Sequence, residues 1–149
     1  MNSSDRQRME HIRSYCVDVA KTVQRFGAEY ETFLADTDYL NSVSMSIMQI
    51  GELSIGLSDE FKHTEGAEMP WGSIRGMRNL YAHAYAKMDK MSIWETATID
   101  IPALERFCDK VLGRAMEKAS VPQRLSDTKE SVKRQDHTPA ARDKTGPER

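Results

Sequence analysis

The sequence predicts an all-α fold, a bundle of four main antiparallel helices with shorter helices between them. Three features of the 149-residue chain indicate this. Apolar residues recur at spacings of three and four, which is the period of an amphipathic helix. No segment shows the sustained alternation of apolar and polar residues that is typical of half-buried strands. The eight Gly and five Pro are too few for the many turns of a β-sandwich or barrel.

The first helix is expected to begin at Ser4 and to end at Phe26, before Gly27. Ser4 and Gln7 have the spacing of a capping box, in which two side chains satisfy free amides of the first turn. One apolar stripe runs along this helix and consists of Met9, Ile12, Cys16, Val19, Val23 and Phe26.

A second long helix is predicted from a stripe that consists of Leu40, Val43, Ile47, Ile50, Leu53 and Leu57. The segment 28–34 before it is either a short separate helix or the first turns of the long one. Between Lys62 and Pro70 the chain is polar and contains Gly66, so we expect a loop there.

Pro70 and Trp71 are expected to open a third helix, because Pro is tolerated in a first turn. A short helix should follow over residues 92–99, and the last main helix should start at residues 100–102. The buried face of the third helix is predicted to be Trp71, Ile74, Met77 and then Leu80 or Tyr81. The stripe of the last helix is Leu104, Phe107, Cys108, Val111, Leu112 and Ala115.

Composition divides the chain into a body, residues 1–119, and a tail, residues 120–149. The body carries 14 Lys and Arg against 18 Asp and Glu, a net charge of −4, whereas the tail carries seven against five. The tail has no aromatic residue and three of the five Pro, so it cannot bury enough apolar surface to offset its ordering entropy. We expect a disordered tail, with folding on a partner as the alternative.

Several classes of protein are disfavoured by the sequence. No apolar run approaches the roughly 18 residues that span a bilayer, and the first residues lack the apolar stretch of a secretory signal. A cytoplasmic protein without membrane contact is expected. The two Cys lie on apolar stripes, which favours buried reduced thiols over a metal or redox site. An acidic body argues against broad non-specific binding of nucleic acid.

One cationic stretch stands out within this acidic body. Residues 75–90 contain four basic residues and one acid, with His83 among them. Arg78 is a permanent cation and His83 titrates near neutral pH. Five residues along one helix correspond to about 140° of rotation, so the two would not share a face. Either the helix ends between them, or His83 meets its partners across a subunit interface.

The segment Arg78-Asn79-Leu80-Tyr81-Ala82-His83-Ala84-Tyr85 resembles the R-x-x-x-x-H-x-Y signature of HepT toxins, members of the HEPN superfamily. The resemblance covers about residues 5–118 and includes further segments in the order that the family has them. These are Ile47-Met48-Gln49-Ile50-Gly51-Glu52, Pro70-Trp71, Gly76-Met77-Arg78-Asn79, Trp94 and Ile101-Pro102-Ala103-Leu104.

The resemblance implies a HEPN-type bundle and a metal-independent endoribonuclease, so no cofactor is expected. It also implies a toxin whose antitoxin is a nucleotidyltransferase of the MNT type. Arg78 and His83 match the catalytic pair, and Asn79 matches the supporting polar residue after the arginine. Tyr85 matches the tyrosine that the antitoxin can modify with AMP.

The chemistry of RNA cleavage suits these residue types. The ribose 2′-hydroxyl is the nucleophile, so the protein must supply a base, an acid and a cation. Imidazole can fill either proton-transfer role, and a guanidinium can hold two phosphate oxygens. An isologous dimer would bring two copies of His83 and of Arg78 to one site and leave 2′,3′-cyclic phosphate ends.

Other interpretations stay open at this stage. The chain could be a non-catalytic HEPN partner of a nucleotidyltransferase, which its acidic body favours. Tyr81 is expected in the core, and His11 and His63 at the surface. Glu52 either orients Arg78 or is an ordinary solvent-facing residue.

Overall fold

The computed structural model describes residues 1–114, which form one unit, except for the side chains of residue 80 and residues 82–85. All the regular structure in this part is helical, as predicted, and no strand occurs in it. The four main helices are α1 (Ser3–Phe26), α3 (Thr37–Ile55), α5 (Trp71–Ala84) and α7 (Ile101–Val111). The expected tail, residues 120–149, lies outside the described residues.

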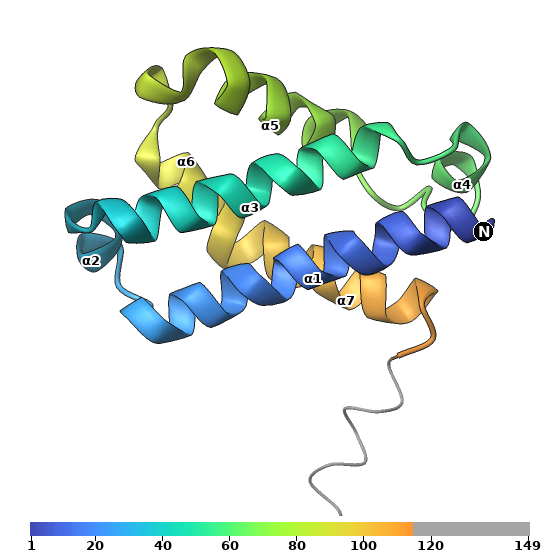
Figure 1. Cartoon of the computed structure of the whole chain (residues 1–149), viewed down its shortest axis with the longest axis horizontal. Helices are drawn as coiled ribbons and strands as arrows, with labels where there is room; N and C mark the ends of the chain where they lie inside the picture. Colours follow the sequence, from blue (N-terminus) through green and yellow to red (C-terminus); the bar gives the residue numbers. More distant parts are fainter. Residues whose placement is uncertain (115–149) are drawn as a thin grey trace, which may run out of the picture. The chain divides into compact units, whose positions relative to one another are not determined.

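Neighbouring main helices are antiparallel: α3 packs against both α1 and α5, and α7 packs against α1 (Figure 1). Helices α5 and α7 also meet, because the rings of Trp71 and Phe107 lie 6.0 Å apart between centroids. This arrangement follows from the stripes, because the apolar face of each helix must be covered by a neighbour. The predicted stripe residues are buried or half-buried throughout the described part of the chain.

The ends of the first helix differ in part from the prediction. Asn2 caps α1, and its side chain accepts a hydrogen bond from the Asp5 amide at 2.8 Å. The predicted capping box is therefore wrong, and the Ser4 hydroxyl instead accepts from the guanidinium of Arg8 one turn later. Gly27 ends the helix as predicted, with a φ of 102° that favours glycine.

Short helices join the main ones. The segment before α3 is a separate helix, α2 (Tyr30–Ala35), because the extended backbone of Asp36 interrupts the helix. The Asp36 side chain then caps α3 by accepting hydrogen bonds from the backbone amides of Asp38 and Tyr39. Helix α4 (Asp59–His63) extends one residue beyond Lys62, so the predicted loop starts only at Thr64. The indole of Trp71 donates to the Gly66 carbonyl at 2.8 Å and closes this loop onto α5.

From Lys90 to Val111 the chain is continuous helix. A 3₁₀ turn, η1 (Tyr85–Lys87), follows α5, and α6 (Lys90–Glu95) starts at its cap Asp89. A π-helical turn, η2 (Thr96–Asp100), leads from α6 directly into α7. Helix α7 starts at Ile101, as predicted, although Asp100 keeps helical dihedral angles and makes no side-chain cap.

An aromatic cluster closes the end of the bundle near α2. Phe33 lies at the centre, with its ring centroid 5.2 Å from those of both Tyr39 and Trp94. The Tyr39 hydroxyl donates to the carbonyl of Gly27 at 3.0 Å, so the cluster also ties α3 to the end of α1. Burial raises the pKa of Tyr39.

Two buried carboxylates hold the bundle together in ways that the stripes do not indicate. Asp5 accepts from the amide of Ser58 at 2.9 Å and from its hydroxyl at 2.6 Å. Asp109 accepts from Nε of Arg13 at 2.6 Å and joins α7 to α1. The hydrogen bond that Arg13 donates to Asp109 raises the pKa of Arg13.

The minor expectations for single residues are confirmed. Tyr81 is buried, and His11 and His63 are exposed. Cys16 and Cys108 are buried free thiols, and the hydrogen bond between them together with burial raises the pKa of Cys16. Within residues 1–114, no helix is long and apolar enough to cross a membrane.

Candidate functional site

The motif residues 78–85 lie at the end of α5 and at the start of η1. Helix α5 continues without interruption to Ala84, so it does not end between Arg78 and His83, and that alternative is wrong. Positions 78 and 83 are therefore about 140° apart around one helix axis. Tyr85 is the first residue of η1. The side chains of His83 and Tyr85 lie outside the described residues.

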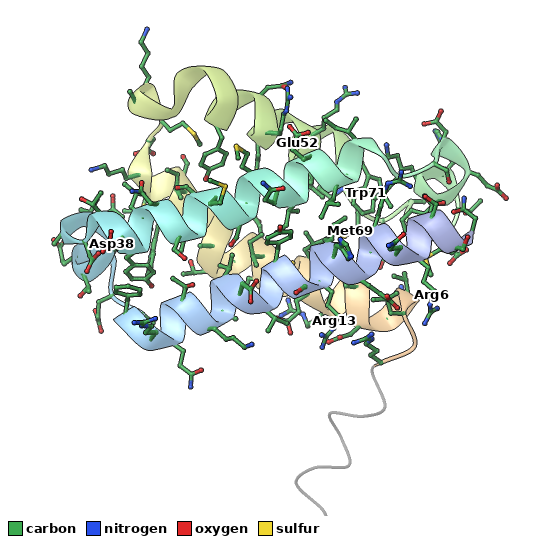
Figure 2. All side chains as sticks on the ribbon, viewed as in Figure 1. Arg6, Arg13, Asp38, Glu52, Met69 and Trp71 are labelled. Atoms are coloured by element: carbon green, nitrogen blue, oxygen red, sulfur yellow. The ribbon has the colours of Figure 1, made fainter. Side chains whose placement is uncertain are left out.

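The guanidinium of Arg78 is held from two sides. Its Nε donates to Oε1 of Glu52 on α3, and its Nη1 donates to Oδ1 of Asn79 at 3.2 Å. Glu52 lies on α3 at the side that faces α5 (Figure 2). The Arg78 and Glu52 side chains are 35% and 43% exposed, so solvent and ligands can reach the pair. Of the two interpretations of Glu52, the structure supports the one in which it orients Arg78.

The backbone of α5 at Arg78 lies very close to Gly51 of α3. A Cβ atom added to Gly51 would lie 2.7 Å from the Cβ of Arg78 and 3.2 Å from the backbone oxygen of Ile74. Contacts under 3.0 Å essentially never occur for a real Cβ, so only glycine fits between the two helices at this distance. Gly51 thus sets the position of the Arg78 backbone, and the next residue, Glu52, contacts its guanidinium.

The surroundings of Arg78 are cationic on α5 and beyond it. Arg75 is exposed one turn before Arg78, and Lys87 and Lys90 are exposed after the helix. Positions three residues apart lie on neighbouring turns of one helix side. Arg75 and Arg78 can therefore contact successive charges of an anionic polymer.

A groove of about 450 Å³ lies between α3 and α5 next to this site and is lined by Asn41, Ser44, Met45, Met48 and Tyr81. Met45 is 55% exposed although it is a large apolar residue. Ser44 is buried, and its hydroxyl has no hydrogen-bond partner among the residues that the structure describes. The hydroxyl oxygen of Ser44 is itself buried, so it lies beneath the groove surface.

Metal-binding residue types do not gather in the described part of the chain. Among the side chains placed in the structure, no three His, Cys, Asp or Glu residues are arranged to hold an ion. The site around Arg78 instead offers one guanidinium, one carboxylate and one amide.

Comparison with known proteins decides the family. The family model described as "Ribonuclease HepT-like" matches residues 7–111. The chain belongs to this HepT-like ribonuclease family. Two relatives carry the name "Putative RNase", one from Caldanaerobacter subterraneus and one from Methanocaldococcus jannaschii. The first is 32% identical over 70% of this chain and 90% of its own length, and the second is 25% identical over 72% and 90%. No solved structure gave a significant match.

The HepT-like match ends at residue 111, just inside the described unit, so the tail lies outside it. All four site residues of the prediction fall within the matched range. Of these four, the structure brings Arg78 and Asn79 into contact, and it adds Glu52 and Gly51.

Sequence reasoning missed the close approach at Gly51 and the burial of Ser44. A glycine inside an apolar stripe is a signal of close helix packing, although it does not indicate which helix approaches. Ser44 gave no signal, because a single Ser on a helix is usually a surface residue.

Proposed function

We propose that this HepT-like protein is a metal-independent endoribonuclease and the toxin of a toxin–antitoxin pair. Arg78 and His83 are its catalytic residues in this proposal, and Asn79 supports Arg78. The observation that carries it is the position of Arg78, the first motif residue. Its guanidinium is accessible and is held in a defined orientation by Glu52 and Asn79.

The reaction uses the RNA itself as nucleophile. The ribose 2′-oxygen forms a bond to the adjacent phosphorus, and the bond from phosphorus to the 5′-oxygen breaks. One imidazole takes the 2′-hydroxyl proton, and a second gives a proton to the leaving 5′-oxygen. Arg78 stabilises the charge that builds up on the non-bridging oxygens. The products are a 2′,3′-cyclic phosphate and a free 5′-hydroxyl.

This division of labour requires two imidazoles and therefore two protein copies. A two-fold homodimer can bring one His83 and one Arg78 from each chain to a single phosphate, which one chain alone cannot do. The groove beside Tyr81 is the surface we assign to the second copy. A second copy docked there would bury the exposed apolar side chain of Met45.

The antitoxin in this proposal is a nucleotidyltransferase of the MNT type that transfers AMP to the hydroxyl of Tyr85. Tyr85 starts the turn that follows α5, two residues after His83. An AMP group at this position would place a phosphate near Arg78, where it competes with RNA for the cation. We place the reaction in the cytoplasm, where its RNA substrate is found.

The acidic body, with its net charge of −4, favours a second candidate function. In that alternative the HEPN bundle is a non-catalytic partner of a nucleotidyltransferase. Arg78 and Glu52 would then be an ordinary surface ion pair.

The test is RNA digestion in EDTA with protein whose intact mass excludes an AMP adduct. Wild type is compared with Arg78→Ala and His83→Ala, and with the control variants Arg106→Ala and His11→Ala, which change exposed residues on other helices. We expect both motif variants to lose at least about 100-fold in cleavage rate, while both controls cut like wild type. No cleavage by wild type, or equal cleavage by all variants, would support the binding partner instead.

A further inference from the structure

Glu52 and Arg78 form the only ion pair between α3 and α5 in the described part of the chain. Both side chains are more than one-third exposed, and ion pairs of this kind contribute little to the free energy of unfolding. The antiparallel contact between α3 and α5 already rests on buried apolar residues such as Ile47 and Ile74. Stability alone therefore does not account for this pair.

The hydrogen bonds define which edge of the guanidinium remains available. A guanidinium has five N–H groups in one plane. Glu52 takes the Nε hydrogen and Asn79 takes one hydrogen of Nη1. Among the described residues, Nη2 has no partner. The edge formed by Nη1 and Nη2 is thus directed away from Glu52 and can bind two oxygens of a phosphate.

Two consecutive residues of α3 fix the two ends of Arg78. Gly51 admits the backbone and Cβ of Arg78 at short distance, and Glu52 fixes the guanidinium at the end of the side chain. An unrestrained arginine has four flexible torsions and loses much rotational freedom when it binds. An arginine held at both ends loses less on meeting the phosphate.

We propose that Glu52 is a positioning residue that holds Arg78 by Nε, so that the Nη edge meets the phosphate that is cleaved. This inference rests on the proposed ribonuclease function. Glu52 does not contact the substrate in this scheme and acts only through Arg78. The negative charge of Glu52 also repels a nearby phosphate. Glu52 therefore orients Arg78 but weakens the binding of the RNA substrate in its ground state.

These two effects predict an unusual pair of kinetic changes. Without the carboxylate, Arg78 is disordered and kcat falls. The phosphate meets an uncompensated cation, so KM stays the same or decreases. A merely structural residue would lower the fraction of active protein instead, and that lowers the apparent kcat without improving KM.

The experiment measures kcat and KM for RNA cleavage with the full-length protein and three variants: Glu52→Ala, Glu52→Gln and the control Glu68→Gln. Glu68 is also an exposed carboxylate, 54% accessible, and it pairs with Lys110 of α7 at 3.0 Å instead of with Arg78. We expect Glu52→Ala to lower kcat by about 10- to 100-fold without raising KM. Glu52→Gln should recover most of this loss, because its amide oxygen can accept the same hydrogen bond. Glu68→Gln should match wild type.

A readout that needs no activity is the NMR signal of the Arg78 Nε–H group. We expect a slowly exchanging, shifted signal in wild type and in Glu68→Gln, and its loss in Glu52→Ala. In an Arg78→Lys background, which lacks Nε, Glu52→Ala should cause no further fall in kcat.

The inference is overturned if Glu52→Ala keeps kcat within twofold of wild type, or if its effect is undiminished in the Arg78→Lys background. A different result would show that the proposed ribonuclease function itself is wrong. In that case wild type cleaves no RNA, or cleaves it independently of Arg78, whatever residue stands at position 52.

Discussion

Gly51 and Arg78 lie in direct backbone contact where α3 packs against α5, and a Cβ on residue 51 would lie 2.7 Å from the Cβ of Arg78. The two other nearest atoms belong to the α5 backbone, so no flexible side-chain end can move aside. In Gly51→Ala, α5 must shift, which costs about 1–3 kcal/mol of unfolding free energy. This exceeds the gain of up to about 1 kcal/mol in helix propensity. Chemical denaturation of the variant measures the balance.

The control for this variant is Gly76→Ala. Gly76 lies inside α5 and has no atom within 4 Å of an added Cβ. We expect a gain of about 0.5–1 kcal/mol there from helix propensity alone. Equal changes in stability for the two variants would contradict the close contact at Gly51. Gly51→Ala should also slow RNA cleavage, because it displaces Arg78.

The long helices could be predicted from the sequence because their burial follows a local period. Each apolar stripe, such as the one from Met9 to Val23, lies within a single helix. Its residues are buried regardless of which other helix packs against them. The first cap was misassigned because Asn2 and Ser4 are both good caps, and only the backbone decides between them.

The contacts within the site could be predicted only in part, because they join residues distant in sequence, and the sequence left open whether Glu52 orients Arg78. Glu52 is 26 residues from Arg78, and Asp5 is 53 residues from Ser58. No periodicity connects such positions. The π-helical turn η2 was missed for a related reason, since one additional residue per turn leaves the apolar pattern almost unchanged.

Asp5 is expected to make stability depend on pH. Burial alone would raise its pKa, but the hydrogen bonds from the hydroxyl and amide of Ser58 outweigh burial, and the pKa is lowered below 3.8. The ionised form therefore stabilises the fold above the unfolded pKa of about 3.9. This contribution is lost as the pH falls from about 5 through the folded pKa.

The measurement is urea unfolding of wild type and Asp5→Asn between pH 7 and pH 2.5. We expect Asp5→Asn to be about 1–3 kcal/mol less stable at pH 7, with the difference shrinking below about pH 4. Asp18→Asn changes an exposed carboxylate on the same helix and should match wild type. A difference between wild type and Asp5→Asn that does not change with pH would contradict the lowered pKa.

Arg13 and Asp109 should be coupled in folding. Their side chains are only 20% and 8% exposed, and the pair joins α1 to α7. A double-mutant cycle with Arg13→Ala and Asp109→Ala should give a coupling of about 1–2 kcal/mol. The exposed pair Glu68–Lys110 serves for comparison and should give about 0.5 kcal/mol or less. Equal couplings would mean that burial does not strengthen the Arg13–Asp109 pair.

The groove between α3 and α5 should be needed for both dimerisation and cleavage. Met45 is 55% exposed at its rim, and a charge there would have to be desolvated when a second copy docks. We expect Met45→Glu to be monomeric by analytical ultracentrifugation at concentrations where wild type is dimeric. Because the proposed site needs residues from two chains, the same variant should lose RNA cleavage by at least about tenfold.

Ile99→Glu is the matched control for this interface. Ile99 is 63% exposed, more than Met45, but it lies on η2, away from the residues that line the groove. We expect this variant to remain dimeric and active, because it adds the same charge at a surface with no assigned partner. If Ile99→Glu dissociates the dimer and Met45→Glu does not, the second copy docks on a different face. In that case the α3–α5 groove is not where the two active-site halves meet.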